Sequence, residues 1–245
     1  VLVLLAWGWL RRGAGMGREP TVSLTPPGGG GDVAGMAMDM PAELSPQRVG
    51  LIFAMWWIMM LAMMLPAAAP TILLYAQVAK QAQPDREPAS LNFLLGYIAI
   101  WAAFSLLATT LHLALERMAI FSPQVMAFDR RWISAGILIG GGLYQLTALK
   151  DACLHQCRNP AQFLSRYYKP GAGGALGMGV RHGAFCVGCC WLLMLLLFAG
   201  GVMNLAWIAL LTLLVAAEKL LPFGRIVSRA TGVALNMAGF ALALF

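Results

Sequence analysis

Long apolar runs separated by short polar segments dominate the chain. A helix needs roughly 20 mostly apolar residues to cross the hydrocarbon of a bilayer. The run at residues 185–217 is too long for one crossing and contains Gly200-Gly201 and Asn204 near its centre, so we divide it into two helices joined by a tight turn. The pattern predicts an all-α fold, a polytopic transmembrane helical bundle with six full helices at residues 51–79, 91–115, 132–149, 185–199, 202–217 and 226–245.

Three regions follow from this pattern. Residues 1–12 hold an apolar stretch too short to span a bilayer and then Arg11-Arg12, which indicates a truncated N-terminal transmembrane helix; a cleaved signal peptide would carry its positive charges before the apolar stretch. Residues 13–48 are rich in Gly and Pro and are predicted to form a flexible linker that also contains methionines. Residues 49–245 are predicted to form the helical membrane domain.

One segment of this domain, residues 149–181, is less apolar than its neighbours. We expect it to lie at the membrane interface and to contain a short helix that ends at Pro160 or shortly after it. The glycines between Pro170 and Gly183 indicate a pliable connection into the next helix.

The composition supports a membrane protein and excludes a nucleic-acid-binding one. Hydrophobic residues make up 60% of the chain and charged residues 11%, and the mean hydropathy is +0.74. The formal net charge is +7, but no Lys/Arg cluster is interleaved with exposed aromatic residues. The loops at residues 80–86, 150–181 and 219–229 share one side of the predicted bundle and carry ten of the 17 Lys and Arg residues. This side is predicted to be the cytoplasmic face of a bacterial inner membrane.

Four soft metal ligands lie close together in the sequence "VRHGAFCVGCCWLLMLLLFAGG". On an α-helix His182, Cys186, Cys189 and Cys190 fall within an arc of about 100°. Thiolate and imidazole groups together favour Cu(I), Zn(II) or an iron–sulfur centre, and one helical face seldom surrounds an ion without help from another segment. This pattern predicts a metal or redox site that is completed by ligands from elsewhere.

A second cysteine pair can supply those ligands. The sequence "KDACLHQCRNP" puts Cys153 and Cys157 one turn apart, and with the three cysteines above they are all the cysteines of the chain. A single cysteine in a membrane helix is commonly a small apolar filler. A C-x-x-C spacing at Cys186 and Cys189 is also compatible with thiol–disulfide exchange, although the βαβ context usual for that motif is missing.

Methionines form a separate pattern. In "MWWIMMLAMMLPAAAP", Met55, Met59 and Met63 form a stripe on one helical face. Neutral thioethers bind Cu(I) within hydrocarbon without burying an anion, which favours methionine at depth and cysteine at the rim. Core packing by flexible methionines is the alternative explanation. In the linker, Met36, Met38 and Met40 alternate in a polar context that gives no packing reason for them.

Ionisable residues near the helix ends are further candidates. His112 and Glu116 lie one turn apart, and Glu218-Lys219 ends an apolar run. Such groups are functional or extend to the interface. No G-x-S-x-G, Gly-rich phosphate loop or H-E-x-x-H is present, so an enzyme activity would have to be redox-based or metal-based.

Four motifs in sequence order carry a family resemblance: "MWWIMMLAMMLP", "GGLYQLTALKDACLHQCRNP", "GVRHGAFCVGCCWLLMLLLFAGGVMNLAW" and "EKLLPFG". Over roughly Gly50 to Gly224 the chain resembles a bacterial integral-membrane family described as predicted metal-binding and otherwise little characterised. The resemblance implies a polytopic helical protein with a metal site at Lys150, Cys153, Cys157, His182, Cys186, Cys189 and Cys190.

The sequence thus predicts a membrane protein that binds Cu(I), with zinc as the second choice of metal, and transfers it across or at the inner membrane. Its expected partners are the lipid bilayer and a metallochaperone or metalloprotein. The alternatives are a membrane thiol–disulfide oxidoreductase and a scaffold subunit for a metalloprotein.

Overall fold

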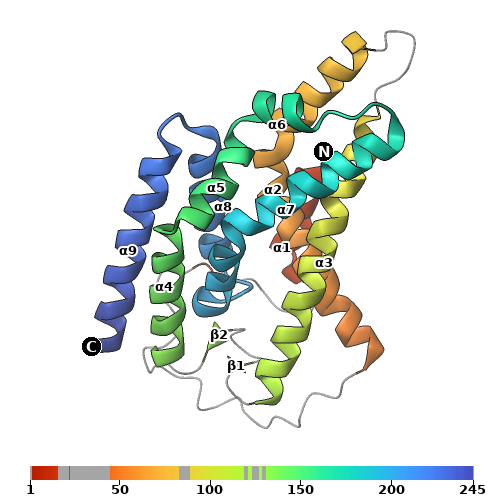
Figure 1. The fold of residues 1–245 in the computed structure, drawn as a ribbon. Coiled ribbons are helices and arrows are strands. Elements are labelled where there is room, and N and C mark those ends of the chain that lie inside the picture. Colours follow the sequence, from red (N-terminus) through yellow and green to blue (C-terminus); the bar gives the residue numbers. More distant parts are fainter. Residues whose placement is uncertain are drawn as a thin grey trace.

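The structure is a computed structural model of the chain (Figure 1). Met36, Met38 and Met40, together with most of the linker that contains them, lie outside the residues that it describes. The described residues are 2–15, 22, 45–82, 89–118, 121–122, 127–128 and 131–244.

Helices build almost all of the described fold, in agreement with the predicted all-α class. They are α1 (Leu2–Arg11), the short 3-10 helix η1 (Gly13–Gly15), α2 (Pro46–Ala82), α3 (Ser90–Arg117), α4 (Arg131–Gln145), α5 (Ala148–Arg158), α6 (Pro160–Tyr167), α7 (Gly171–Gly200), α8 (Leu205–Leu220) and α9 (Gly224–Leu244). A minimal antiparallel pair, β1 (Phe121–Ser122) with β2 (Ala127–Phe128), follows α3. Figure 1 shows this pair at one end of the bundle and α6 at the opposite end.

The number of spanning helices differs from the prediction. Within the described residues, four helices are long and apolar enough to cross a membrane, namely α2, α3, α7 and α9. The expected full helix at 132–149 is divided into α4 and α5, which meet at a bend of 66° as a broken span or re-entrant loop. The expected helix at 202–217 is α8, whose 16 residues are fewer than the roughly 20 that a crossing requires. The predicted six full helices are therefore wrong.

A local capping interaction explains the break between α4 and α5. Thr147 adopts an extended conformation at the N-cap of α5, and its hydroxyl accepts a hydrogen bond from the Lys150 backbone N–H at 3.3 Å. Threonine at this position satisfies a backbone donor that the first helical turn leaves unpaired. The apolar run therefore ends one helix and starts another instead of continuing straight.

The predicted division of the long apolar run is confirmed at residues 200–204. α7 ends at Gly200, and Gly201 has a φ of 90°, a conformation that favours glycine. The Asn204 side chain then caps α8 by accepting hydrogen bonds from the backbone N–H groups of Ala206 and Trp207.

The glycine-rich segment is helical, so the expected pliable connection at residues 170–183 is wrong. Its glycines form the first half of α7 and let α3 approach closely. A Cβ atom on Gly179 would collide with the carbonyl oxygen of Phe93, and one on Gly96 would collide with that of Leu176. The glycines therefore serve helix packing, in the way that small residues do between membrane helices.

This packing yields a first prediction. Gly179→Ala should lower the free energy of unfolding by about 1–3 kcal/mol, because the added methyl group forces α3 and α7 apart. Gly177→Ala is the matched control, since a Cβ at Gly177 meets nothing within 4 Å. Thermal unfolding in detergent measures both variants, and equal midpoints for the two would contradict the close packing.

Polar side chains buried between the helices tie α4, α5, α8 and α9 together. Lys150 Nζ lies 2.7 Å from Glu218 Oε2. The Gln145 amide donates to Glu218 Oε1 at 2.9 Å, and the Ser228 hydroxyl donates to Gln145 Oε1 at 3.2 Å. Glu218 and Lys219 are both buried, so the interpretation that they extend to the interface is wrong. The charge of Glu218 is compensated by Lys150.

Candidate metal centre

The four candidate ligands of the histidine and cysteine motif lie on the buried side of α7. His182, Cys186, Cys189 and Cys190 are each 2% exposed or less. The Cys189 and Cys190 thiols donate to the backbone carbonyl of Cys186, at 3.1 and 2.9 Å. Regular helical spacing therefore brings the three sulfur atoms to one turn of α7, within the protein and away from solvent.

The second cysteine pair reaches the same turn from α5. The Cys157 side chain is buried and lies beside the sulfur atoms of Cys186 and Cys189. Cys153 is half-buried, and its Sγ lies 3.0 Å from the position that a Cβ on Gly188 would occupy. Glycine at position 188 lets α5 pack against α7 at this point. The two sequence motifs meet in space, and all five cysteines are free thiols.

A methionine of α2 completes the group of sulfur atoms. Met64 Sδ lies 3.9 Å from Cys190 Sγ. Met55, Met59 and Met63 are fully buried along the same helix, within the hydrophobic core. The structure therefore places Met64 at the cysteines, whereas the methionines of the stripe precede it along α2.

A buried ammonium group lies among these sulfur atoms. Lys219 Nζ is 2.8 Å from Cys186 Sγ and 3.9 Å from Met64 Sδ. A buried cation is costly unless a charged or strongly accepting group is beside it. Because Glu218 is already paired with Lys150, the acceptors that the described residues provide for Lys219 are the sulfur atoms of Cys186 and Met64. The positive charge of Lys219 thus lies beside sulfur atoms of both α7 and α2.

Tyr97 and His182 line the group on the side of α3. The Tyr97 hydroxyl oxygen lies 3.2 Å from Cys186 Sγ and 3.2 Å from the Met64 carbonyl oxygen. The His182 ring lies among aromatic rings, with centroids 5.8 Å from Tyr97 and 5.2 Å from Phe163. Its buried Nδ1 has no hydrogen-bond partner among the described residues. A bound metal ion would give such a nitrogen a partner.

The thiols are close together but are not arranged as a finished metal site. In the part of the chain that the structure describes, no three His, Cys, Asp or Glu side chains are positioned to hold a metal ion. Two of the thiols point at the backbone carbonyl of Cys186. The donor set nevertheless fits a soft metal, because it consists of thiols, a thioether and an imidazole.

A second polar group lies at the start of α2 and the end of α3. Glu116 pairs with Arg48 at 2.8 Å and with His112 Nε2 at 3.3 Å. The indole N–H of Trp56 donates to His112 Nδ1 at 3.4 Å. These contacts join the end of α3 to the first half of α2. Their partners on α2 lie more than two helical turns before Met64.

Apolar helices of spanning length pack around a buried group of thiols and a thioether, which are donor types that a soft metal ion prefers. The chain belongs to the PpoB2 family of copper chaperones, whose family model matches residues 53–242. No curated protein and no solved structure matches it. The family membership confirms the expectation of a metal-binding family and gives the protein a copper-related role.

The sequence did not predict that three further residues, Met64, Lys219 and Tyr97, lie together beside the cysteines. Met64 lay outside the chosen helical stripe, although the same methionine-rich motif contains it. Lys219 stood out only as an ionisable residue at the end of an apolar run. Nothing in the sequence around Tyr97 indicates that its hydroxyl lies beside Cys186.

Proposed function

We propose that this protein is an integral protein of the bacterial inner membrane that binds Cu(I) and hands it to a metalloprotein or metallochaperone. The observation that carries the proposal is the buried positive charge of Lys219 among the sulfur atoms of Cys186 and Met64, with further thiols beside it. Polarisable sulfur atoms that already lie beside one buried cation are suited to a monovalent soft cation. The proposed ligands are Cys157, Cys186, Cys189, Cys190, Met64 and His182.

The donor types favour Cu(I) over Zn(II). Zinc sites in proteins use cysteine, histidine and carboxylate ligands, whereas thioethers together with thiolates select Cu(I). Met64 supplies the thioether. The nearby carboxylate of Glu218 is held by Lys150 and Gln145 and does not face the sulfur atoms as a free ligand. Zinc is the second choice.

The methionines of α2 give copper a route to the cysteines. From Met55 to Met64 the helix rises about 14 Å, at 1.5 Å per residue. All of its methionines in this interval are buried within the protein. Neutral thioethers can bind a Cu(I) ion in turn along an apolar interior, and no buried anionic ligand remains unpaired when the ion moves on. We propose that Met55, Met59 and Met63 carry copper toward the cysteines, after Met36, Met38 and Met40 have collected it outside the membrane.

Metal loading of the purified chain tests the proposal. The protein in detergent is reduced, loaded anaerobically with Cu(I) or Zn(II), desalted and analysed for bound metal and for X-ray absorption at the copper edge. We expect retained Cu(I) with a shell dominated by sulfur. No retained copper, or a shell of oxygen and nitrogen only, would reject it.

Rapid alkylation followed by mass spectrometry separates this function from thiol–disulfide exchange. Copper binding predicts five thiols that react after the metal is removed, in line with the five free cysteines of the structure. A mixed disulfide between Cys186 or Cys189 and a second protein would favour the oxidoreductase instead.

The methionine route is a testable part of the function. In the test variant Met55, Met59 and Met63 are all changed to Leu. It should retain Cu(I) at the cysteines but transfer Cu(I) across the membrane of proteoliposomes about tenfold more slowly. The reason is that leucine keeps the packing and lacks the sulfur atom. Met237→Leu, on the exposed side of α9, is the control for the substitution itself. Unchanged transfer in the triple variant would show that the stripe serves packing only.

A further inference from the structure

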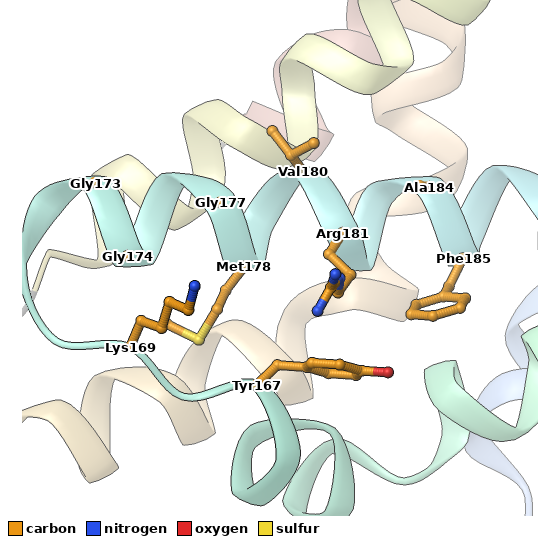
Figure 2. Close-up of a pocket in the computed structure, with 10 residues that line it drawn as sticks. All are labelled: Tyr167, Lys169, Gly173, Gly174, Gly177, Met178, Val180, Arg181, Ala184 and Phe185. Carbon is orange, nitrogen blue, oxygen red and sulfur yellow. The ribbon is translucent and has the colours of Figure 1, made fainter.

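A cavity of about 550 Å³ opens beside the first half of α7, at the end of α6 (Figure 2). Its apolar wall includes Met178 and Phe185, and several glycines of α7 leave it open. The residues that line it do not include the cysteines or Met64, although Phe185 directly precedes Cys186 in the sequence.

The polar groups of this cavity are positive. Lys169 and Arg181 both line it, and Figure 2 shows their side chains directed into the same space. The Arg181 guanidinium lies 4.4 Å from the centre of the Tyr167 ring, which holds it in place by a cation–π contact. Among the residues that the structure describes, no carboxylate lines the cavity. In the described residues neither Lys169 nor Arg181 has an ion-pair partner, so both charges remain available to an anion.

The surroundings suit a lipid better than a soluble anion. α7 is one of the helices long and apolar enough to cross a membrane, and the cavity adjoins its first half, where Leu176 and Val180 expose apolar side chains. Basic pockets between helices at the cytoplasmic side of a membrane bind anionic headgroups. Lys169 and Arg181 belong to the side predicted to be cytoplasmic.

We propose that this cavity binds the phosphate group of an anionic phospholipid. Lys169 and Arg181 contact the phosphate, while Met178 and Phe185 pack against the glycerol and upper acyl groups. The site rests on the proposed placement of the protein in a membrane and is independent of its metal. A lipid bound here would brace the part of α7 that leads directly to Cys186.

Lipid binding by native mass spectrometry tests the proposal on the full chain in detergent. Phosphatidylglycerol should bind, and phosphatidylcholine should bind at least about tenfold more weakly, since its headgroup has no net negative charge. The double variant Lys169→Gln with Arg181→Gln should lose at least about tenfold in affinity for phosphatidylglycerol. Lys80→Gln with Arg117→Gln removes two exposed cations elsewhere and should leave binding unchanged.

Two further ligands identify the source of the anion. Inorganic phosphate and a poly-glutamate peptide are titrated separately, and we expect neither to compete with phosphatidylglycerol. Competition by phosphate would overturn the lipid assignment, and competition by the peptide would replace the lipid with an acidic protein partner. Unchanged lipid binding by the Lys169 and Arg181 variant would remove the site. An unchanged thermal unfolding midpoint of that variant shows that its fold is intact, so this test and the copper test fail independently.

Discussion

Replacing Cys186, Cys189 and Cys190 together by Ser is expected to reduce retained Cu(I) to the background level. The three thiols lie on one buried turn of α7, and Ser offers a hard oxygen where the soft ion requires sulfur. Loss of a residue that merely supports a ligand costs 10- to 100-fold in metal affinity, so loss of a ligand itself should cost more than about 100-fold. Competition with a chromophoric Cu(I) chelator measures this affinity.

Single substitutions on α5 show whether the effect is specific to the site. Cys157→Ser should weaken binding because Cys157 is buried beside Cys186 and Cys189. Cys153→Ser is the matched control, one turn away on the same helix, where the sulfur is half-buried against Gly188. If the triple variant keeps its copper, the metal is bound elsewhere and the proposed site is wrong.

Lys219→Met is expected to weaken Cu(I) binding by about 10- to 100-fold. Cu(I) bound by two thiolates carries one net negative charge, and the ammonium beside Cys186 neutralises that charge within the apolar interior. A hydrogen bond to a charged group contributes about 1.5–3 kcal/mol, and about 1.4 kcal/mol corresponds to a tenfold change in affinity. The same chelator competition measures the change.

The conservative variant separates charge from packing. Lys219→Arg keeps the positive charge and should bind Cu(I) more tightly than Lys219→Met, although its guanidinium is larger than the ammonium. A comparison of their unfolding midpoints checks that both variants are folded. Tighter Cu(I) binding by Lys219→Met would contradict this role and would show that the ammonium competes with copper for the place between the sulfur atoms.

The helices that sequence predicted well are those with continuous apolar runs. The runs at 51–79, 91–115 and 226–245 correspond to α2, α3 and α9. An apolar segment of that length has few alternatives to a helix in a bilayer, because a helix satisfies all of its own backbone hydrogen bonds. The turn at residues 200–204 was also predictable, since Gly200-Gly201 and Asn204 have local conformational preferences. The break after α4 was not, because Leu146 and Thr147 interrupt the helix without interrupting the hydrophobicity.

The glycines before His182 show the opposite error. Local preference predicts a flexible connection there, since glycine in a helix interior costs roughly 0.5–1 kcal/mol relative to alanine. Close packing of α3 against Gly179 outweighs that preference and keeps the segment helical. Tertiary contacts therefore reversed a conclusion that was reasonable from the segment alone.

The sequence by itself determined the chemical character of the candidate site: soft donor groups spaced along one helix, a second cysteine pair, and a methionine-rich helix, in an apolar helical protein. Only the tertiary structure decided which of these groups meet. Met64, Tyr97, Cys157, Cys186 and Lys219 come from five different helices. Spacing along one helix fixes which side chains share a face, but the approach of another helix depends on small residues such as Gly188 and on where buried charges find partners.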